Sequence, residues 1–337
     1  MVEGFRFYST KSNSKLDFKK LRPMILNRIE ERSKEYPITG MLRVAREVLG
    51  ARSTVYDGVS TLIHHFPVWS CKHMLCNAWN PTECDLDTLE VYDKHLRYCP
   101  EVYIGEGGHL IQTCAGYRHH AKNKVHNWVQ GGIDDVLLPV ETYHLRKMFQ
   151  KVIEHHERFD HDRIPAILEL CLQAGVNVND PTLSSSTSSP HNPINEDIMP
   201  KSLSDYDLRT LGVQTLKAWE VLRSGVQKLL LVYPARVCKH CSEVHVGPSG
   251  HKARMCGFFK GERWNGTHFW VKAKVDDLVP PNIVWFRRRQ DPPVLVDKGR
   301  GFYGRAPAVV DLCSKAGAVV PSNYYCMMKM DGITGPV

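Results

Sequence analysis

An internal repeat constrains the fold of this 337-residue chain more than any other feature. Cys99–Asp135 aligns without gaps on Cys241–Asp277 at an offset of 142 residues, with 13 of 37 positions identical. The shared pattern is C-x-E-V-x2-G-x2-G-H-x4-C-x11-H-x-W-V-x4-D-D. Ile164–Gly175 and Ala306–Gly317 match at the same offset. The chain is therefore expected to contain two copies of one structural unit, which agrees with the two domains that its length suggests.

The first copy contains a segment that the second copy lacks. Gly58–His73 aligns on Gly225–His240 at an offset of 167 residues, which is 25 more than the offset downstream. The extra residues are 74–98, and they divide a C-K-H-C motif that is continuous in the second copy. We interpret this segment as an insertion, with an unspliced intron as one hypothesis for its origin. Because loop-closure entropy grows slowly with length, the insertion weakens metal binding in the first copy without preventing it.

The repeated cysteines and histidines have the spacing of metal ligands. In the second copy, Cys238 and Cys241 form C-x2-C, and His251 and Cys256 form H-x4-C. Two such pairs are typical of a closed, tetrahedral Zn²⁺ site, which stabilises a small module. The matching residues of the first copy are Cys71, Cys99, His109 and Cys114. Zn²⁺ is therefore the predicted cofactor of both copies.

A second histidine leaves the fourth ligand open. His126 and His268 follow the last cysteine of each motif by twelve residues, and each precedes a repeated tryptophan. We favour His109 and His251 as ligands and keep His126 and His268 as alternates, which otherwise pack against Trp128 and Trp270. The remaining repeated thiols, Cys171 and Cys313, lie in apolar helical runs and are expected to be buried in the core, and Cys76 and Cys84 in the insertion are treated as incidental.

Composition excludes two classes of protein. No apolar run approaches the roughly 18–20 residues that cross a bilayer, so a membrane-embedded protein is excluded. Eleven cysteines without an apolar signal segment make a secreted disulfide scaffold improbable. The basic, hydroxyl-rich residues 1–14, with Arg6 shortly before Ser9, are typical of an organellar transit peptide, with a disordered basic tail as the alternative.

Periodicity and turn signals predict an α+β fold that is mainly helical, with two tandem small zinc-stabilised repeats, helical lead-ins and a flexible linker. Helices are expected over 15–35, 39–63 and 206–233, and shorter ones over Pro165–Gly175 and Pro307–Gly317. The predicted organisation is a targeting segment (1–14), a lead-in (15–69), a first domain (70–180, insertion 74–98), a linker (181–205), a lead-in (206–236), a second domain (237–322) and a tail (323–337).

The charge pattern favours a polyanionic partner. The formal net charge is +8, and cations and aromatic residues alternate after the last cysteine of each motif, which suits RNA because cations meet phosphates and rings stack on unpaired bases. The predicted RNA-binding residues are Arg118, Lys122, Lys124, Trp128, Lys252, Arg254, Lys260, Arg263, Trp264, Trp270, Lys272 and Lys274. A zinc-dependent nuclease and a zinc-based protein-interaction scaffold are the alternatives. Asp134-Asp135 and Asp276-Asp277 are expected to form turns or helix caps, and no catalytic residue is predicted.

The doubled motif C-K-x-C-x-E-V-x-V-G-x2-G-H-x4-C, followed by H-x-W, resembles the plant APO family, and the resemblance covers about Lys15 to Val320. The resemblance implies two APO domains, zinc-dependent RNA binding and a role in group II intron splicing in chloroplasts or mitochondria, and other organellar splicing factors are possible partners. The short N-terminus resembles that of a mitochondrial member, with the chloroplast as the alternative location. The second motif matches the family pattern fully, and the first matches only when the insertion is skipped.

Overall fold

The computed structural model describes most of the chain between its two ends, with several internal gaps. The described residues are 23, 24, 27, 28, 30, 31, 33–72, 99–112, 114, 125–149, 152–177, 203–254, 256 and 267–330. The insertion 74–98, the targeting segment 1–14 and most of the linker 181–205 therefore lie outside the described residues.

The two copies of the sequence repeat form the same succession of elements, and the second copy continues into two further short helices. The first consists of α2 (Met41–His65), β1 (Val68–Cys71), β2 (Val102–Ile104), β3 (Trp128–Gln130), α4 (Ile133–Val136), β4 (Glu141–Tyr143), the 3₁₀ helix η2 (His156–Asp160), β5 (Arg163–Pro165) and α5 (Ala166–Gln173). The second consists of α7 (Asp205–Val232), β6 (Ala235–Cys238), β7 (Val244–Val246), β8 (Trp270–Lys272), α8 (Val275–Leu278), β9 (Ile283–Phe286), η4 (Asp297–Gly299), β10 (Gly304–Pro307), α9 (Ala308–Lys315), η5 (Ser322–Tyr324) and α10 (Tyr325–Met328).

Each repeat builds a small antiparallel sheet and an antiparallel strand pair. The sheets have the orders β2-β1-β3 and β7-β6-β8, and the strand pairs are β4-β5 and β9-β10. The central strand of each sheet ends in the first cysteine of its motif, where Cys71 is paired with Trp128 and Cys238 with Trp270. The pairing therefore places the start of each C-x2-C motif beside the H-x-W motif.

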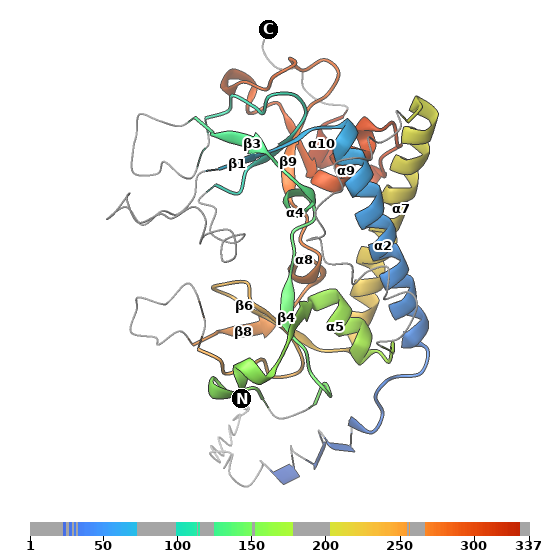
Figure 1. Cartoon of the computed structure of the whole chain (residues 1–337), viewed down its shortest axis with the longest axis vertical. Helices are drawn as coiled ribbons and strands as arrows, with labels where there is room; N and C mark the ends of the chain where they lie inside the picture. Colours follow the sequence, from blue (N-terminus) through green and yellow to red (C-terminus); the bar gives the residue numbers. More distant parts are fainter. Residues whose placement is uncertain are drawn as a thin grey trace, which may run out of the picture.

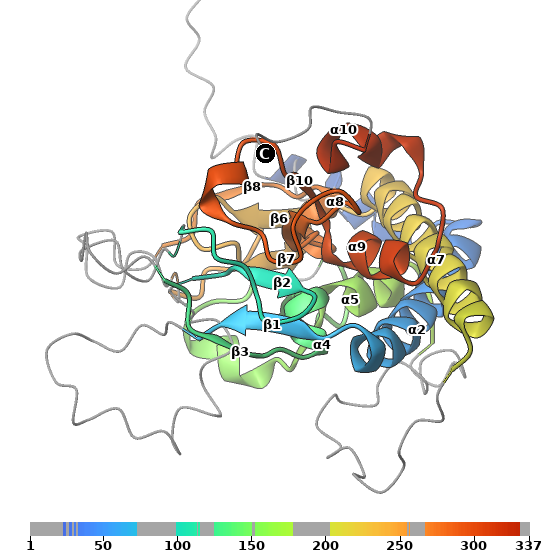
Figure 2. The same ribbon diagram turned by 90° about the horizontal axis from the view of Figure 1, so that it is seen from above.

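The two repeats interlock. The sheet of the first repeat packs against β9 and α9 of the second, and the sheet of the second repeat packs against β4 and α5 of the first. Figure 1 shows these two mixed lobes one above the other, with α2 and α7 side by side along one flank, and the view in Figure 2 agrees. Hydrogen bonds link the two repeats within each lobe. In the lower lobe the hydroxyl of Thr142 donates to the carbonyl of Val244 at 3.0 Å, and in the upper lobe the amide of Leu110 donates to the carbonyl of Leu295 at 2.8 Å.

A shared core holds the repeats together. Helices α2 and α7 run antiparallel, and one hydrophobic cluster joins residues of both helices to both sheets and to α5 and α9. Gly58 of α2 lies against Thr215 of α7, and its repeat counterpart Gly225 lies against Val48, the counterpart of Thr215. The contacts are therefore related by an approximate twofold axis between the repeats.

Four of the five predicted helices agree with the structure, and the fifth, expected over 15–35, lies only partly within the described residues. Helices α2 and α7 cover the segments expected at 39–63 and 206–233, each ends two residues before Pro67 or Pro234, and α5 and α9 follow Pro165 and Pro307. The mixed α+β class is observed, but a mainly helical fold is not confirmed, because strands make up two sheets and two strand pairs. None of the described helices combines the length and apolarity needed to span a bilayer.

Candidate metal centres and nucleic-acid interface

Four side chains of the second repeat converge at the end of β6. They are Cys238, Cys241, Cys256 and His268. Their ligand atoms all lie within 4.8 Å of one another, and three of the four residues are buried while Cys241 is partly exposed. The Nδ1 atom of His268 lies 3.3 Å from the Sγ atom of Cys241. Three sulfurs and one imidazole nitrogen at this separation form a donor set able to hold one metal ion.

The first repeat contains the matching group, in which every residue is buried: Cys71, Cys99, Cys114 and His126. Its ligand atoms also lie within 4.8 Å of one another. The Sγ atoms of Cys71 and Cys114 are 3.9 Å apart, and His126 Nδ1 lies 3.6 Å from Cys99 Sγ. Cys71 and Cys99 thus lie in one cluster although the insertion 74–98 separates them in sequence.

The structure places the alternate histidines with the sulfurs. His109 and His251, which we favoured from the sequence, are buried behind His126 and His268 and meet them edge to face, with ring centroids 4.8 and 4.7 Å apart. The physical reason is the strand pairing, because Trp270 lies opposite Cys238 in the sheet and so brings His268, two residues earlier in the chain, to the cysteines. His251 lies five residues before Cys256, and its Nε2 lies 3.5 Å from Glu243 of the same repeat.

The repeated tryptophans hold both histidines of each pair in place. Trp270 stacks on His268 at 4.9 Å, and its Nε1 donates to the carbonyl of His251 at 3.0 Å. Trp128 does the same for His126 and His109. Gly250 precedes His251 at φ +72°, and a Cβ there would lie 2.6 Å from Trp270, so this turn requires glycine. The structure therefore places the two tryptophans, predicted as RNA-binding residues, in packing roles beside the clusters.

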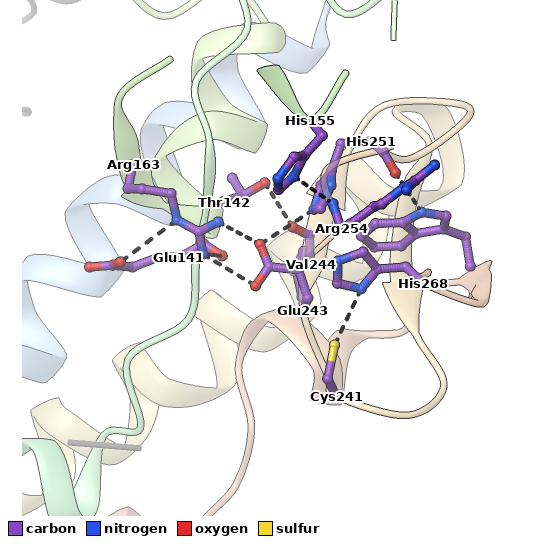
Figure 3. A network of polar contacts seen from close by, with 11 residues as sticks. Glu141, Thr142, His155, Arg163, Cys241, Glu243, Val244, His251, Arg254 and His268 are labelled. Carbon is purple, nitrogen blue, oxygen red and sulfur yellow. Dashed lines mark hydrogen bonds and ion pairs between the residues drawn. The ribbon is translucent and has the colours of Figure 1, made fainter. Parts of the chain in front are cut away.

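A charged network from the first repeat braces the second cluster (Figure 3). Arg163 of β5 forms an ion pair of 2.5 Å with Glu243, and Glu243 lies 3.5 Å from Nε2 of His251. The ring of Tyr143, from the first repeat, meets His251 edge to face at 5.0 Å, and Arg163 stacks over Tyr143. Residues of one repeat therefore fix the side chain that packs against the cluster histidine of the other.

Local charges set the protonation of these groups. Burial raises the pKa of Glu243, but hydrogen bonds from His251 and Arg163 outweigh it and hold that pKa at about 2, so Glu243 is ionised. Burial, followed by the nearby His251, lowers the pKa of His268 to about 4. At neutral pH His268 is then an uncharged imidazole, which is the form that binds a metal ion.

The pKa values and the spacing of the cluster thiols are compatible with a cation bound between them. Burial raises the pKa of Cys238, but the amides of His240, Cys241 and Phe269 outweigh it and lower that pKa below the ordinary value. The pKa of Cys241 is raised, first by burial and then by the adjacent Cys238. A cation bound between two neighbouring sulfurs allows both of them to ionise. Tetrahedral Zn–S bonds of about 2.3 Å place sulfurs about 3.8 Å apart, close to the 3.9 Å between Cys71 and Cys114.

The remaining predicted residues fall into three groups. Among the other predicted RNA-binding residues, Lys252, Arg254, Lys272 and Lys274 are exposed. Those that lie outside the described residues are Arg118, Lys122, Lys124, Lys260, Arg263 and Trp264. Cys171 and Cys313 are fully buried, as predicted. The aspartate pairs form helix caps, as predicted, because Asp135 accepts from the amide of Gly132 at 2.8 Å and Asp277 from the amide of Lys274 at 2.6 Å.

Sequence reasoning missed the supporting residues Glu243, Arg163 and Tyr143. A signal for Glu243 was present, because the glutamate of C-x-E-V recurs as Glu101, which lies 3.6 Å from His109. No comparable signal marked Arg163 and Tyr143, since they reach the cluster only through the packing of the two repeats.

Comparisons with known proteins agree with the repeat. The sequence pattern of the family described as APO RNA-binding matches residues 84–200 and again 201–333. APO protein 2, chloroplastic, from Arabidopsis thaliana is 38% identical over 264 residues, which cover 69% of this chain and 60% of that protein. APO protein 1, chloroplastic, is 33% identical over 328 residues (87% of this chain, 69% of that protein).

APO protein 3, mitochondrial, from the same plant is 34% identical over 319 residues, covering 86% of this chain and 73% of that protein. This chain therefore spans about two thirds of the length of these relatives. No solved structure matches the fold. With two matches to the family pattern and three similar relatives, the chain belongs to the APO RNA-binding family.

Proposed function

We propose that this protein binds RNA in a plant organelle and that each repeat holds one structural Zn²⁺ ion. The observation that carries the proposal is the pair of Cys₃His clusters, in a chain that belongs to an RNA-binding family. The proposed ligands are Cys71, Cys99, Cys114 and His126 in the first repeat and Cys238, Cys241, Cys256 and His268 in the second.

Zinc in such a site has a structural role. Four protein ligands leave no open position for a water molecule, so the ion stabilises the fold rather than activating a nucleophile. It also supplies the positive charge that allows neighbouring thiols to ionise together. The exposed side chains Lys252, Arg254, Lys272 and Lys274 then meet the phosphates of RNA.

The proposed RNA partner is a structured group II intron, and the proposed role is to promote its splicing or processing, together with other organellar splicing factors. The resemblance of the doubled motif to the APO family supports this assignment. We place the protein in the mitochondrion, with the chloroplast as the alternative, because the N-terminal composition resembles a mitochondrial transit peptide. The relatives carry both chloroplastic and mitochondrial names.

Two other functions make different predictions. A zinc-dependent nuclease needs free carboxylates, and the capping roles of Asp135 and Asp277 favour binding over cleavage. A zinc-based protein-interaction scaffold predicts no salt-dependent affinity for RNA.

The test uses the purified chain, with metal content measured by mass spectrometry and RNA binding by fluorescence anisotropy. We expect two zinc ions per chain, and RNA affinity that falls linearly with salt on logarithmic axes. Removing zinc with a chelator weakens binding, and returning Zn²⁺ but not Mg²⁺ restores it. Absence of RNA binding contradicts the proposal and favours the scaffold, and shortening of the RNA in Mg²⁺ favours the nuclease.

A further inference from the structure

An exposed phenylalanine lies at the edge of the second metal cluster. Phe269 is 56% exposed, although its sequence neighbours His268 and Trp270 turn inward. The register of β6 and β8 continues to this point, because the amide of Lys239 donates to the carbonyl of Phe269 at 2.9 Å. Phe269 therefore sits opposite Lys239 at the end of the sheet, with much of its ring open to solvent.

Two further side chains lie beside this ring. The Nζ atom of Lys239 is 6.0 Å from the centroid of Phe269, and the ring of His240 meets it at 6.0 Å with an interplanar angle of 62°. Both residues are exposed. A flat apolar surface next to a cation is the arrangement with which proteins hold an unpaired base, since the ring stacks on the base and the cation meets the phosphate.

The metal cluster fixes the position of all three residues. Lys239 and His240 are the two residues between Cys238 and Cys241, and Phe269 directly follows His268. A filled site would therefore hold Lys239, His240 and Phe269 in one arrangement before RNA arrives.

At the equivalent described positions, the first repeat has no aromatic ring. The equivalent cross-strand pair is Lys72 and Asn127, whose backbone hydrogen bond is 2.7 Å long. Asn127 is exposed and keeps the backbone geometry without an aromatic ring. The repeats thus share a metal cluster and differ in what they present at its edge.

We propose that Lys239, His240 and Phe269 form a platform on which one unpaired RNA base stacks, with Lys239 at the adjoining phosphate. The proposal rests on the proposed RNA-binding function and assigns recognition of unpaired bases to the second repeat.

The test measures the affinity of the full chain for an unstructured single-stranded RNA and for a duplex of equal length. We expect Phe269→Ala to weaken single-strand binding roughly 5- to 150-fold, the range for losing one base–aromatic stack, and to leave duplex binding unchanged. Phe269→Trp keeps wild-type affinity. Lys239→Gln reduces the slope of log affinity against log salt by about 0.7, as expected for one lost phosphate contact to a single strand.

Two variants serve as matched controls. Asn127→Ala changes the equivalent position of the first repeat, and Tyr206→Ala removes an exposed aromatic ring at the start of α7. Both are expected to bind RNA like the wild type. Zinc content is measured for every variant, and if Phe269→Ala loses metal, Phe269→Leu replaces it, because leucine keeps the apolar side chain without the ring.

The outcomes separate this proposal from the proposed function. If the wild type binds neither RNA, RNA binding itself is wrong. If the wild type binds in a salt-dependent manner and the zinc-loaded Phe269 variants without a ring bind the single strand equally well, the platform is wrong and RNA binding stands. Equal losses for single strand and duplex also overturn the platform, because a duplex offers no unpaired base.

Discussion

The two histidines of each repeat differ in what their nitrogens face. His268 directs Nδ1 towards the sulfur of Cys241, and its lowered pKa keeps it neutral. His251 lies behind it, with Nε2 3.5 Å from Glu243. Glu243 therefore holds His251, and His251 packs against the candidate ligand His268. Groups that surround a metal site commonly orient its ligands in this indirect way.

This difference predicts distinct effects on metal binding. His268→Ala removes one of four ligands, so the zinc content after dialysis is expected to fall from two ions per chain towards one. His251→Ala keeps all four ligands, and we expect zinc to stay bound but to pass to a competing chelator at about 10- to 100-fold lower chelator concentration. His126→Ala and His109→Ala test the same pair in the first repeat. The reverse pattern, with metal lost only from the His251 variant, would restore the ligand set that the sequence favoured.

Spacing along the chain predicted the cysteines but not the histidine. The C-x2-C pair is local, so its sulfurs converge in any knuckle turn. His251 and His268 both fit the sequence pattern. Which of them lies beside the sulfurs depends on the pairing of β8 with β6, and a strand as short as β8, with three residues, cannot be recognised from the sequence. Likewise, Arg163 reaches Glu243 across 80 residues of sequence, so only the packed fold reveals their contact.

At the scale of whole elements, the approach of α2 to α7 depends on two glycines that the repeat makes equivalent. A methyl group on Gly58 would collide with Oγ1 of Thr215, and one on Gly225 with the side chain of Val48. Gly50, on the exposed side of α2, has no neighbour within 4 Å of such a methyl group. Helix α2 therefore contains one glycine at the contact with α7, Gly58, and one away from it, Gly50.

The three glycines give a matched test of this packing. Gly58→Ala and Gly225→Ala are each expected to lower the free energy of unfolding by about 1–3 kcal/mol through overpacking. Gly50→Ala is expected to raise it by about 1 kcal/mol, because alanine favours the helix. Urea denaturation of the zinc-loaded chain measures all three. Thr215→Ala should relieve the penalty of Gly58→Ala, and stabilisation by the Gly58 variant alone would show that the helices do not approach closely there.

The helices were predictable because their signals are local. Apolar periodicity and the prolines that follow marked α2 and α7, and Pro165 and Pro307 marked the starts of α5 and α9. Strands of three or four residues show too little alternation to be recognised, which explains why the expectation was mainly helical. Nothing in a local pattern indicates that β4 and α5 pack on the sheet of the other repeat.

For the molecule as a whole, the exchange of elements makes each repeat incomplete without the other. The first repeat leaves the apolar face of α2 and the edge at β2 to be covered by α7 and β9. The second repeat relies on α2 and on β4 in the same way. Stability is therefore a property of the pair, and a metal ion bound in one repeat would stabilise contacts that the other repeat needs.

This arrangement predicts how the chain behaves when it is divided. Residues 33–177 and 203–330, produced separately in the presence of zinc, are each expected to lack a folded monomer, because each would expose the apolar surface that the other covers. Produced together, they are expected to form a 1:1 complex that retains two zinc ions and unfolds in a single transition. Light scattering after gel filtration and thermal unfolding by circular dichroism measure both states. A monomeric 203–330 fragment that unfolds cooperatively, at the temperature of the intact chain, would mean that each repeat folds on its own elements and that the interlock contributes no stability.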